Sequence, residues 1–150
     1  MPSMFHAPDR EAIEARIDRL APQARGRWGT MTAPQMVWHL DAQLRSLLGE
    51  LDVRPRGSAI TRSAIVKWLI IDSPMPWPRG KVPTAPEFAR HAPGEWPADV
   101  AKLKLDLQRW AGRGLAGGAS VHAAFGPLDA RQTGRLIWRH FDHHLKQFGV

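Results

Sequence analysis

Residues 129–149, which read DARQTGRLIWRHFDHHLKQFG, decide the fold class of this chain. The aspartate at the start can accept hydrogen bonds from the free backbone N–H groups of a first helical turn, and a glycine is a common helix stop. Between them, apolar residues recur every three or four positions, which predicts one buried helix face: Leu136, Ile137, Phe141, Leu145 and Phe148. We therefore predict a long amphipathic helix over residues 130–148, capped by Asp129.

Three further segments carry the helical pattern. Residues 10–20 repeat apolar side chains at helical spacing. Thr32 and Gln35 have the spacing of a capping box and predict a second helix from about Thr32 to Gly49. Residues 98–110 follow Pro97, and a pair of glycines ends them. The remaining apolar segment, TRSAIVKWLII at residues 61–71, fits a short helix or a buried strand; we favour helix, because we find no partner strand elsewhere.

The linking segments are rich in proline or glycine. Seven of the 13 prolines lie from residue 74 to residue 97, which predicts a long loop without regular helix or central strand. A glycine-rich connection occupies residues 112–120, and we find no hairpin signal. The expected fold is an all-α, up-down four-helix bundle with an extra short helix and a long Pro-rich loop, formed by one domain over residues 1–150.

Composition excludes several classes of site. The chain has no cysteine, so disulfides, thiolate nucleophiles and cysteine-based metal sites are excluded. The net charge is +7, but the basic residues are scattered, so we rank a nucleic-acid-binding module below an enzyme. Because no apolar run approaches the ~18 residues of a membrane span and no signal peptide precedes Asp9, we expect a cytoplasmic protein with no membrane partner.

Two histidines of the last helix have the spacing of a metal site. His140 and His144 are four residues apart, so they lie above one another on the same helix face and can point at one atom. His39 borders the inward face of the second helix and supplies a possible third ligand, which would leave a fourth position open. The alternative is that these histidines are partly buried side chains bonded to the backbone.

Other residues are expected around such a site. Gln35, Gln43, Gln147 and backbone carbonyls are candidate acceptors for the second ring nitrogens of the histidines. Trp38 and Trp77 are expected as apolar walls, Lys81 as the contact of an anionic group, and His143 beside the site or at the surface. Trp77 packing simply on the bundle is an equal alternative. His6, His91 and His122 are expected in solvated or capping roles.

The order of these motifs resembles the DinB-like superfamily of metalloenzymes. The resemblance rests on Pro34-Gln-Met-Val-Trp-His39-Leu-Asp and the terminal His140-x-x-x-His144, with further similarity at these segments: Arg27-Trp-Gly-x-Met31, Pro76-Trp-Pro-x-Gly-Lys81, Thr84-Ala-Pro-Glu-Phe88 and Phe125-Gly126-Pro127. It spans most of the chain and is nearest to a small uncharacterised bacterial branch.

The resemblance implies a four-helix bundle in which His39, His140 and His144 bind a divalent metal, with zinc or nickel first and manganese or iron also possible. It also implies a homodimer and a small-molecule substrate such as a low-molecular-weight thiol. We therefore expect a metal-dependent enzyme of the thiol transferase or hydrolase type. The alternative is a non-catalytic helical module that is stabilised by a metal or binds anions or nucleic acid.

Overall fold

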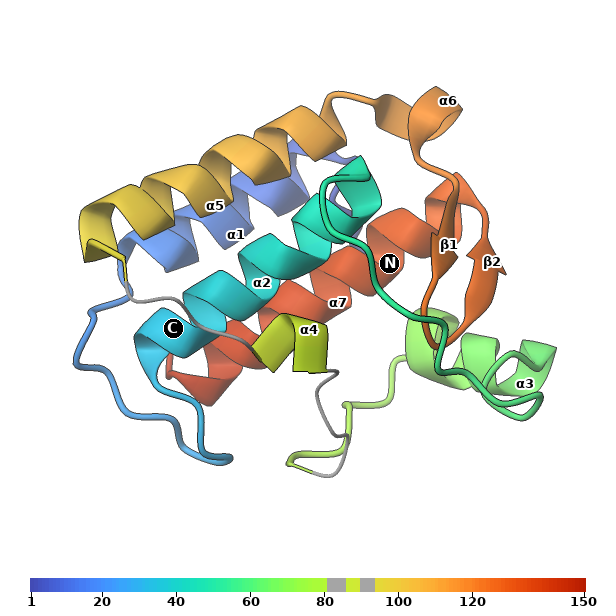
Figure 1. The fold of residues 1–150 in the computed structure, drawn as a ribbon, viewed down its shortest axis with the longest axis horizontal. Helices are drawn as coiled ribbons and strands as arrows, with labels where there is room; N and C mark the ends of the chain where they lie inside the picture. The colour runs from blue at the N-terminus through green and yellow to red at the C-terminus, as the bar shows by residue number, and fades with distance from the viewer. Residues whose placement is uncertain (81–85, 90–93) are drawn as a thin grey trace.

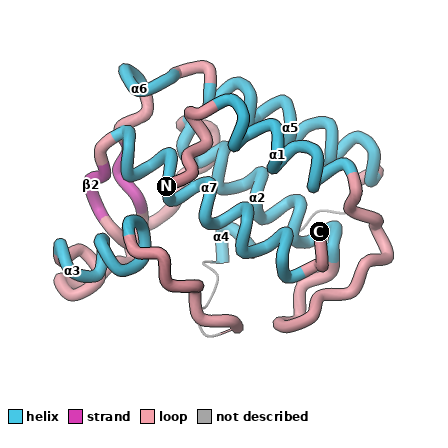
Figure 2. The backbone as a smooth tube through the Cα atoms, turned by 180° about the vertical axis from the view of Figure 1, so that it is seen from behind, coloured by secondary structure: helices cyan, strands magenta, loops and turns pink. Residues whose placement is uncertain are grey.

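The computed structural model describes residues 1–80, 86–89 and 94–150 of the chain and is mostly helical (Figures 1 and 2). Its long helices are α1 (Ala7–Asp18), α2 (Ala33–Leu48), α5 (Trp96–Ala111) and α7 (Ala130–Gln147). The shorter elements are α3 (Ala64–Lys67), the π-helical turn η1 (Trp68–Asp72), α4 (Pro86–Ala89), α6 (Gly114–Gly117), β1 (Ser120–His122) and β2 (Gly126–Leu128).

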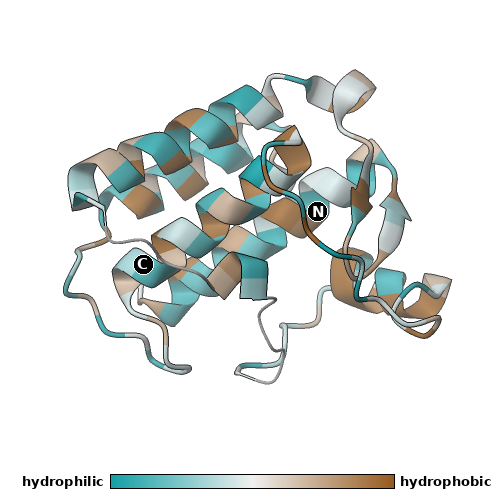
Figure 3. Cartoon of the chain, in the orientation of Figure 1, coloured by the Kyte–Doolittle hydropathy of each residue, from teal (hydrophilic) through white to brown (hydrophobic). Residues whose placement is uncertain are grey.

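The four long helices share one hydrophobic core. Each contributes side chains at helical spacing, and these side chains are buried together: Ile13 and Ile17 of α1, Leu40 and Leu44 of α2, Leu103 and Leu107 of α5, and Ile137, Phe141 and Leu145 of α7. Figure 3 shows the corresponding change from hydrophobic to hydrophilic residues around each helix. Burial of such a face supplies most of the stability of an amphipathic helix. The all-α expectation is thus confirmed for the main body of the chain.

The two helices that matter most for function begin where the sequence predicts. The Thr32 side chain accepts from the Gln35 N–H, and Gln35 bonds back to the Thr32 N–H, so a capping box opens α2. Asp129 and Gln132 make the same pair of bonds at α7. Gly49 closes α2 at φ 82°, a left-handed conformation that favours glycine. These caps fix where each turn of α2 and α7 starts and therefore which side chains face inward.

Most of the segment 61–71 is helical, as expected: residues 64–72 form helical turns, and residues 61–63 precede them as a turn. The expectation that the chain has no paired strands is wrong. Ser63 caps α3, which continues into η1. The chain does contain paired strands: β1 and β2 form an antiparallel hairpin in which Ser120 faces Leu128. Residues 123–125 form the hairpin turn, and Gly126, which opens β2, has φ 69°.

Two connections also contain short helices. Pro86 opens α4 within the Pro-rich segment, since a proline at the first turn of a helix loses no intrahelical hydrogen bond. Residues 114–117 form α6 within the glycine-rich connection. Both were expected to be loop. None of the described helices is both long enough and apolar enough to cross a bilayer.

Candidate metal centre

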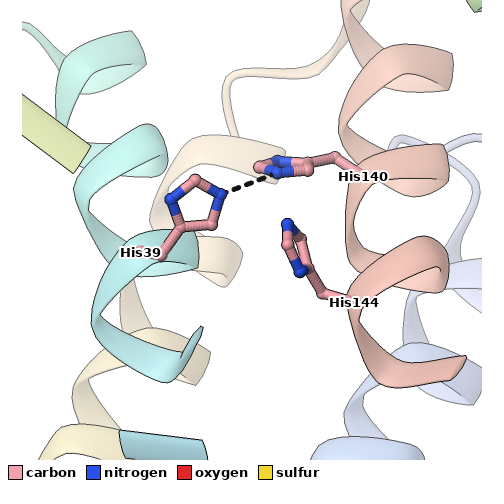
Figure 4. A group of neighbouring side chains, drawn as sticks. All are labelled: His39, His140 and His144. Atoms are coloured by element: carbon pink, nitrogen blue, oxygen red, sulfur yellow. Dashed lines mark hydrogen bonds between the residues drawn. The ribbon is translucent and has the colours of Figure 1, made fainter. Parts of the chain in front are cut away.

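Helices α2 and α7 bring three histidines together, as predicted. His39 projects from α2, and His140 and His144 project from successive turns of α7 toward it (Figure 4). Each offers one ring nitrogen, and these three nitrogens all lie within 4.8 Å of one another. His39 is 5% exposed. Among the described residues, this is the one group of three or more such side chains with metal-site spacing.

The spacing of the nitrogens suits one shared ion. The Nε2 atoms of His39 and His140 are 2.9 Å apart, so without an ion one of them must donate a hydrogen to the other. Nitrogens bound to one tetrahedral zinc at 2.0–2.1 Å would lie about 3.4 Å apart. That value falls between the 2.9 Å contact and the 4.8 Å limit of the group. Small ring rotations would therefore make the three nitrogens ligands of one metal.

Neighbouring acceptors orient two of the rings. The Nδ1 atom of His39 is 3.2 Å from the backbone oxygen of Phe88 in α4, and the Nδ1 atom of His144 is 2.9 Å from Oε1 of Gln147. Gln147 in turn donates from Nε2 to the carbonyl of Trp28 at 2.6 Å. An acceptor on Nδ1 holds the proton there and leaves the Nε2 lone pair for a metal. The predicted roles of Gln147 and of a backbone carbonyl are confirmed.

The ring of His140 has no acceptor on Nδ1, and neither Gln43 nor Gln35 takes the predicted role. The Nδ1 atom of His140 is buried and has no hydrogen-bond partner in the described part of the chain. Gln43, expected as an acceptor, lies buried one turn after His39, and its Oε1 also lacks a partner there. Gln35 is occupied by the α2 capping box. Unsatisfied buried polar atoms are rare in folded proteins, so the Nδ1 atom of His140 and the Oε1 atom of Gln43 each require an explanation.

Burial keeps the three imidazoles neutral. It lowers the pKa of His39 to about 4 and that of His144 to about 3. Burial also lowers the pKa of His140 well below its usual value, and repulsion from the neighbouring histidines adds to this effect. Neutral imidazole is the form that binds a metal, so the three histidines are ready to act as ligands at neutral pH.

The predicted aromatic wall is present in part. The Trp77 ring lies 6.0 Å from the His140 ring and 5.8 Å from the His143 ring, and its Nε1 donates to the carbonyl of Ile70 at 2.8 Å. Trp77 is therefore both a wall beside the histidines and a packed residue. His143 lies beside the centre, with its ring 5.3 Å from that of His144.

Other residues that the sequence placed near the site either lie away from the three histidines or fall outside the described residues. Trp38 is half-buried and has no ring contact with the three histidines in the described ranges. Lys81 and His91 lie outside the described residues. His6 is exposed and pairs with Asp9 at 3.0 Å, whereas His122 caps a turn by accepting from the backbone N–H of Ala124 at 3.2 Å. The capping prediction for His122 is confirmed; the side chain is half-buried, and burial lowers its pKa to about 4.

Sequence reasoning missed three participants near the centre. Phe88 supplies the carbonyl for His39, Trp28 packs 5.6 Å from His143, and Arg79 lies over the Trp28 ring at 4.6 Å. Phe88 and Trp28 stand in segments that carried the family resemblance, but nothing in their residue types indicated these contacts.

Comparison with known proteins adds no relative. No family model matches the chain, and no match was found among curated proteins or solved structures. Membership of the DinB-like superfamily therefore stays a prediction from motifs.

Proposed function

We propose that His39, His140 and His144 bind one divalent metal ion and that the chain is a metal-dependent enzyme. The observation that carries this proposal is the convergence of three ring nitrogens within 4.8 Å. His39 and His140 are 101 positions apart in sequence, so only the packing of α2 beside α7 brings them together. Convergent neutral imidazoles in a buried place are costly unless a hydrogen bond or an ion satisfies them.

Three imidazole ligands favour zinc or nickel, with iron or manganese as further candidates. Three protein ligands leave one tetrahedral position open, as catalytic sites require. A divalent ion held there would supply Lewis acidity and bring the pKa of a water or thiol into the neutral range.

The residues of the chain would hold and orient the ligands. Gln147 and the Phe88 carbonyl keep the protons of His144 and His39 on Nδ1, so that their Nε2 atoms face the centre. Trp77 shields His140 on one side. Because the chain has no cysteine, any sulfur nucleophile must belong to a substrate. This agrees with the thiol transferase or hydrolase chemistry that the DinB-like resemblance implies, and we keep that chemistry as part of the proposal.

Metal binding is tested on protein purified without a nickel column. We expect about one zinc or nickel ion per chain after loading and dialysis, measured by elemental analysis. Removing a ligand in H39A, H140A or H144A should abolish this content, while H6A, which removes an exposed histidine outside the centre, should retain it. Full metal content in H140A would refute the ligand assignment.

An open coordination position separates an enzyme from a metal-stabilised module. Cobalt-loaded protein should show a visible spectrum that changes when a small thiol such as 2-mercaptoethanol is added, because the thiol enters the open position. If one cobalt ion binds per chain and its spectrum does not change with thiols, azide or pH, the centre has no open position and is structural.

A further inference from the structure

A second feature lies next to the histidines, on the other side of Trp77. It is a groove of about 350 Å³ lined by residues of α7 and η1, by the segment 74–79, and by Trp28 and the N-terminal residues Met1 and Pro2. Trp28, Trp77 and Trp138 are among its apolar lining residues, and Arg79 and Arg139 are among its basic ones. The volume lies at the lower end of the range that small-molecule sites occupy, roughly 300–1,000 Å³.

The charge of the groove is positive and only partly neutralised. Arg135 pairs with Asp72, and Lys146 pairs with Asp142 at 2.7 Å. Arg79 and Arg139 have no carboxylate within ion-pair distance in the described part of the chain, and the residues outside it include no aspartate or glutamate.

Arg139 makes no direct ion pair in the described part of the chain, although the carboxylates of Asp142 and Asp72 act on it from a greater distance. Its guanidinium donates to the backbone carbonyls of Ser73 and Met75, which position it without neutralising its charge. Arg139 is half-buried, so this cation has lost part of its hydration. A partly desolvated guanidinium gains most from a carboxylate or phosphate, which it can bind through two parallel hydrogen bonds.

Aromatic rings stand beside both unpaired cations. The Arg79 guanidinium lies 4.6 Å from the centre of the Trp28 ring, and that of Arg139 lies 5.7 Å from the centre of Trp77. Each arginine is thus next to a flat apolar surface. A ligand that fits both features must carry a negative head group on a flat apolar body.

We propose that this groove binds a small organic anion, with its flat body against Trp28 and Trp77 and its head group paired with Arg79 and Arg139. The groove is close to the candidate metal centre, since His143 lines it and lies 5.3 Å, ring to ring, from His144. The anion would therefore be positioned with one end near the three histidines. That this anion is the substrate of the metal centre rests on the proposed function, whereas the binding itself does not.

The test uses 2-naphthoate as the probe and 2-naphthamide as its neutral counterpart, titrated calorimetrically into the protein as purified and after treatment with EDTA. We expect 2-naphthoate to bind both forms at least about tenfold more tightly than the amide, because a charge-assisted hydrogen bond is worth roughly that factor. 2-Naphthyl phosphate and inorganic phosphate in parallel titrations show whether a carboxylate or a phosphate head group is preferred.

Two variants locate the binding. Arg79 makes no hydrogen bond in the described structure, so R79Q should fold normally and bind 2-naphthoate about tenfold more weakly. R54Q removes the same charge from an exposed residue outside the groove and should bind as the wild type does. In NMR spectra, the indole signals of Trp28 and Trp77 should shift on binding, while that of Trp68, an exposed tryptophan outside the groove, should not.

Three results would overturn the proposal: equal binding of acid and amide, unchanged affinity in R79Q, or shifts at Trp68 in place of Trp28 and Trp77. The metal proposal fails separately, because zinc is titrated without any organic anion and 2-naphthoate is titrated into protein from which EDTA has removed the metal and has then been dialysed away.

Discussion

Two of the buried polar side chains of helix α2, His39 and Asp41, lie two residues apart and have different surroundings. Asp41 contacts α5, where Lys102 donates to it at 3.1 Å. His39 contacts α7, where its Nε2 meets that of His140 at 2.9 Å. Both side chains are nearly inaccessible, with exposures of 6% and 5%. The same helix therefore presents one cluster of charges and one cluster of neutral rings on two different sides.

The cluster at α5 has its counter-charges within the protein, although burial outweighs the contact with Lys102 at Asp41 and raises the pKa of that carboxyl to about 6. Asp106 is 1% exposed and receives Lys102 and Arg109, and Arg109 also pairs with Glu50 at 2.6 Å. Burial acts to raise the pKa of Asp106, but the hydrogen bonds from Lys102 and Arg109 outweigh it and lower that pKa. Each buried carboxylate thus has a cationic partner, as structural ion networks require.

The cluster at α7 has no such balance. Its three rings contain no counter-charge, and one ring nitrogen, Nδ1 of His140, has no partner in the described residues. A buried polar group without a partner costs free energy. The comparison agrees with the proposal that the histidines between α2 and α7 hold an ion, whereas the charges between α2 and α5 are paired within the chain. The predictions below separate these two roles.

Zinc should give the largest effect. An ion that binds only the folded state at a free concentration 1,000 times its dissociation constant stabilises by about 4 kcal/mol. We expect the free energy of unfolding in urea to rise by that amount on adding zinc to the wild type, and to change little in H144A. An equal rise in H144A would mean that the ion binds elsewhere and would remove the distinction between the clusters.

Breaking the ion cluster should have the next largest effect. D106N removes a buried charge that two cations share, and we expect a loss of about 3 kcal/mol of unfolding free energy, with or without zinc. D18N is the matched control, since the Asp18–Lys104 pair also involves α5 but Asp18 is 56% exposed; it should cost less than about 1 kcal/mol. If D106N instead abolishes zinc binding in folded protein, the two clusters are not independent.

Sequence reasoning succeeded where the signal is local. The Thr32–Gln35 spacing and the cap residue Asp129 place α2 and α7, because a cap and its first turn are contiguous in sequence. Once both helices are placed, the spacing of His140 and His144 and the inward position of His39 give the candidate metal centre. The same reasoning could not predict the contacts that distant segments make with the histidines, because these contacts depend on the fold and not on local patterns.

The failures have identifiable physical causes. The Phe88 carbonyl is a backbone group, so no residue type announces its bond to His39, 49 positions away. The β1–β2 hairpin was missed because Pro127 argues against a strand, yet it is tolerated where its missing N–H is not needed. Arg79 over Trp28 joins two loops whose meeting depends on the whole fold.

A histidine outside the centre should show a smaller, pH-dependent effect. Burial lowers the pKa of His122 from 6.5 to about 4, so below pH 6.5 the unfolded state binds a proton that the folded state does not. Stability should therefore fall as the pH drops from about 6.5 to about 4, by ~2 kcal/mol after allowance for the partial exposure of the ring.

The variant H122N isolates this contribution. Asparagine can still accept from the turn N–H groups but does not titrate. The difference in unfolding free energy between pH 7 and pH 4 should be smaller in H122N than in the wild type by that amount. Identical pH profiles of H122N and the wild type would show that His122 is not the source of the pH dependence of stability.

The smallest expected change is the most discriminating one. In metal-free protein, H140L removes the unpartnered Nδ1 atom of His140, which is a gain, but leaves Nε2 of His39 without its 2.9 Å contact, which is a cost. These effects oppose each other, and leucine fills a similar volume, so the unfolding free energy should change by less than about 1 kcal/mol. The same variant should lose the stabilisation by zinc. A loss of 3 kcal/mol or more without metal would show that the histidines support the fold as the ions beside α5 do, and that the contrast between the two sides of α2 does not hold.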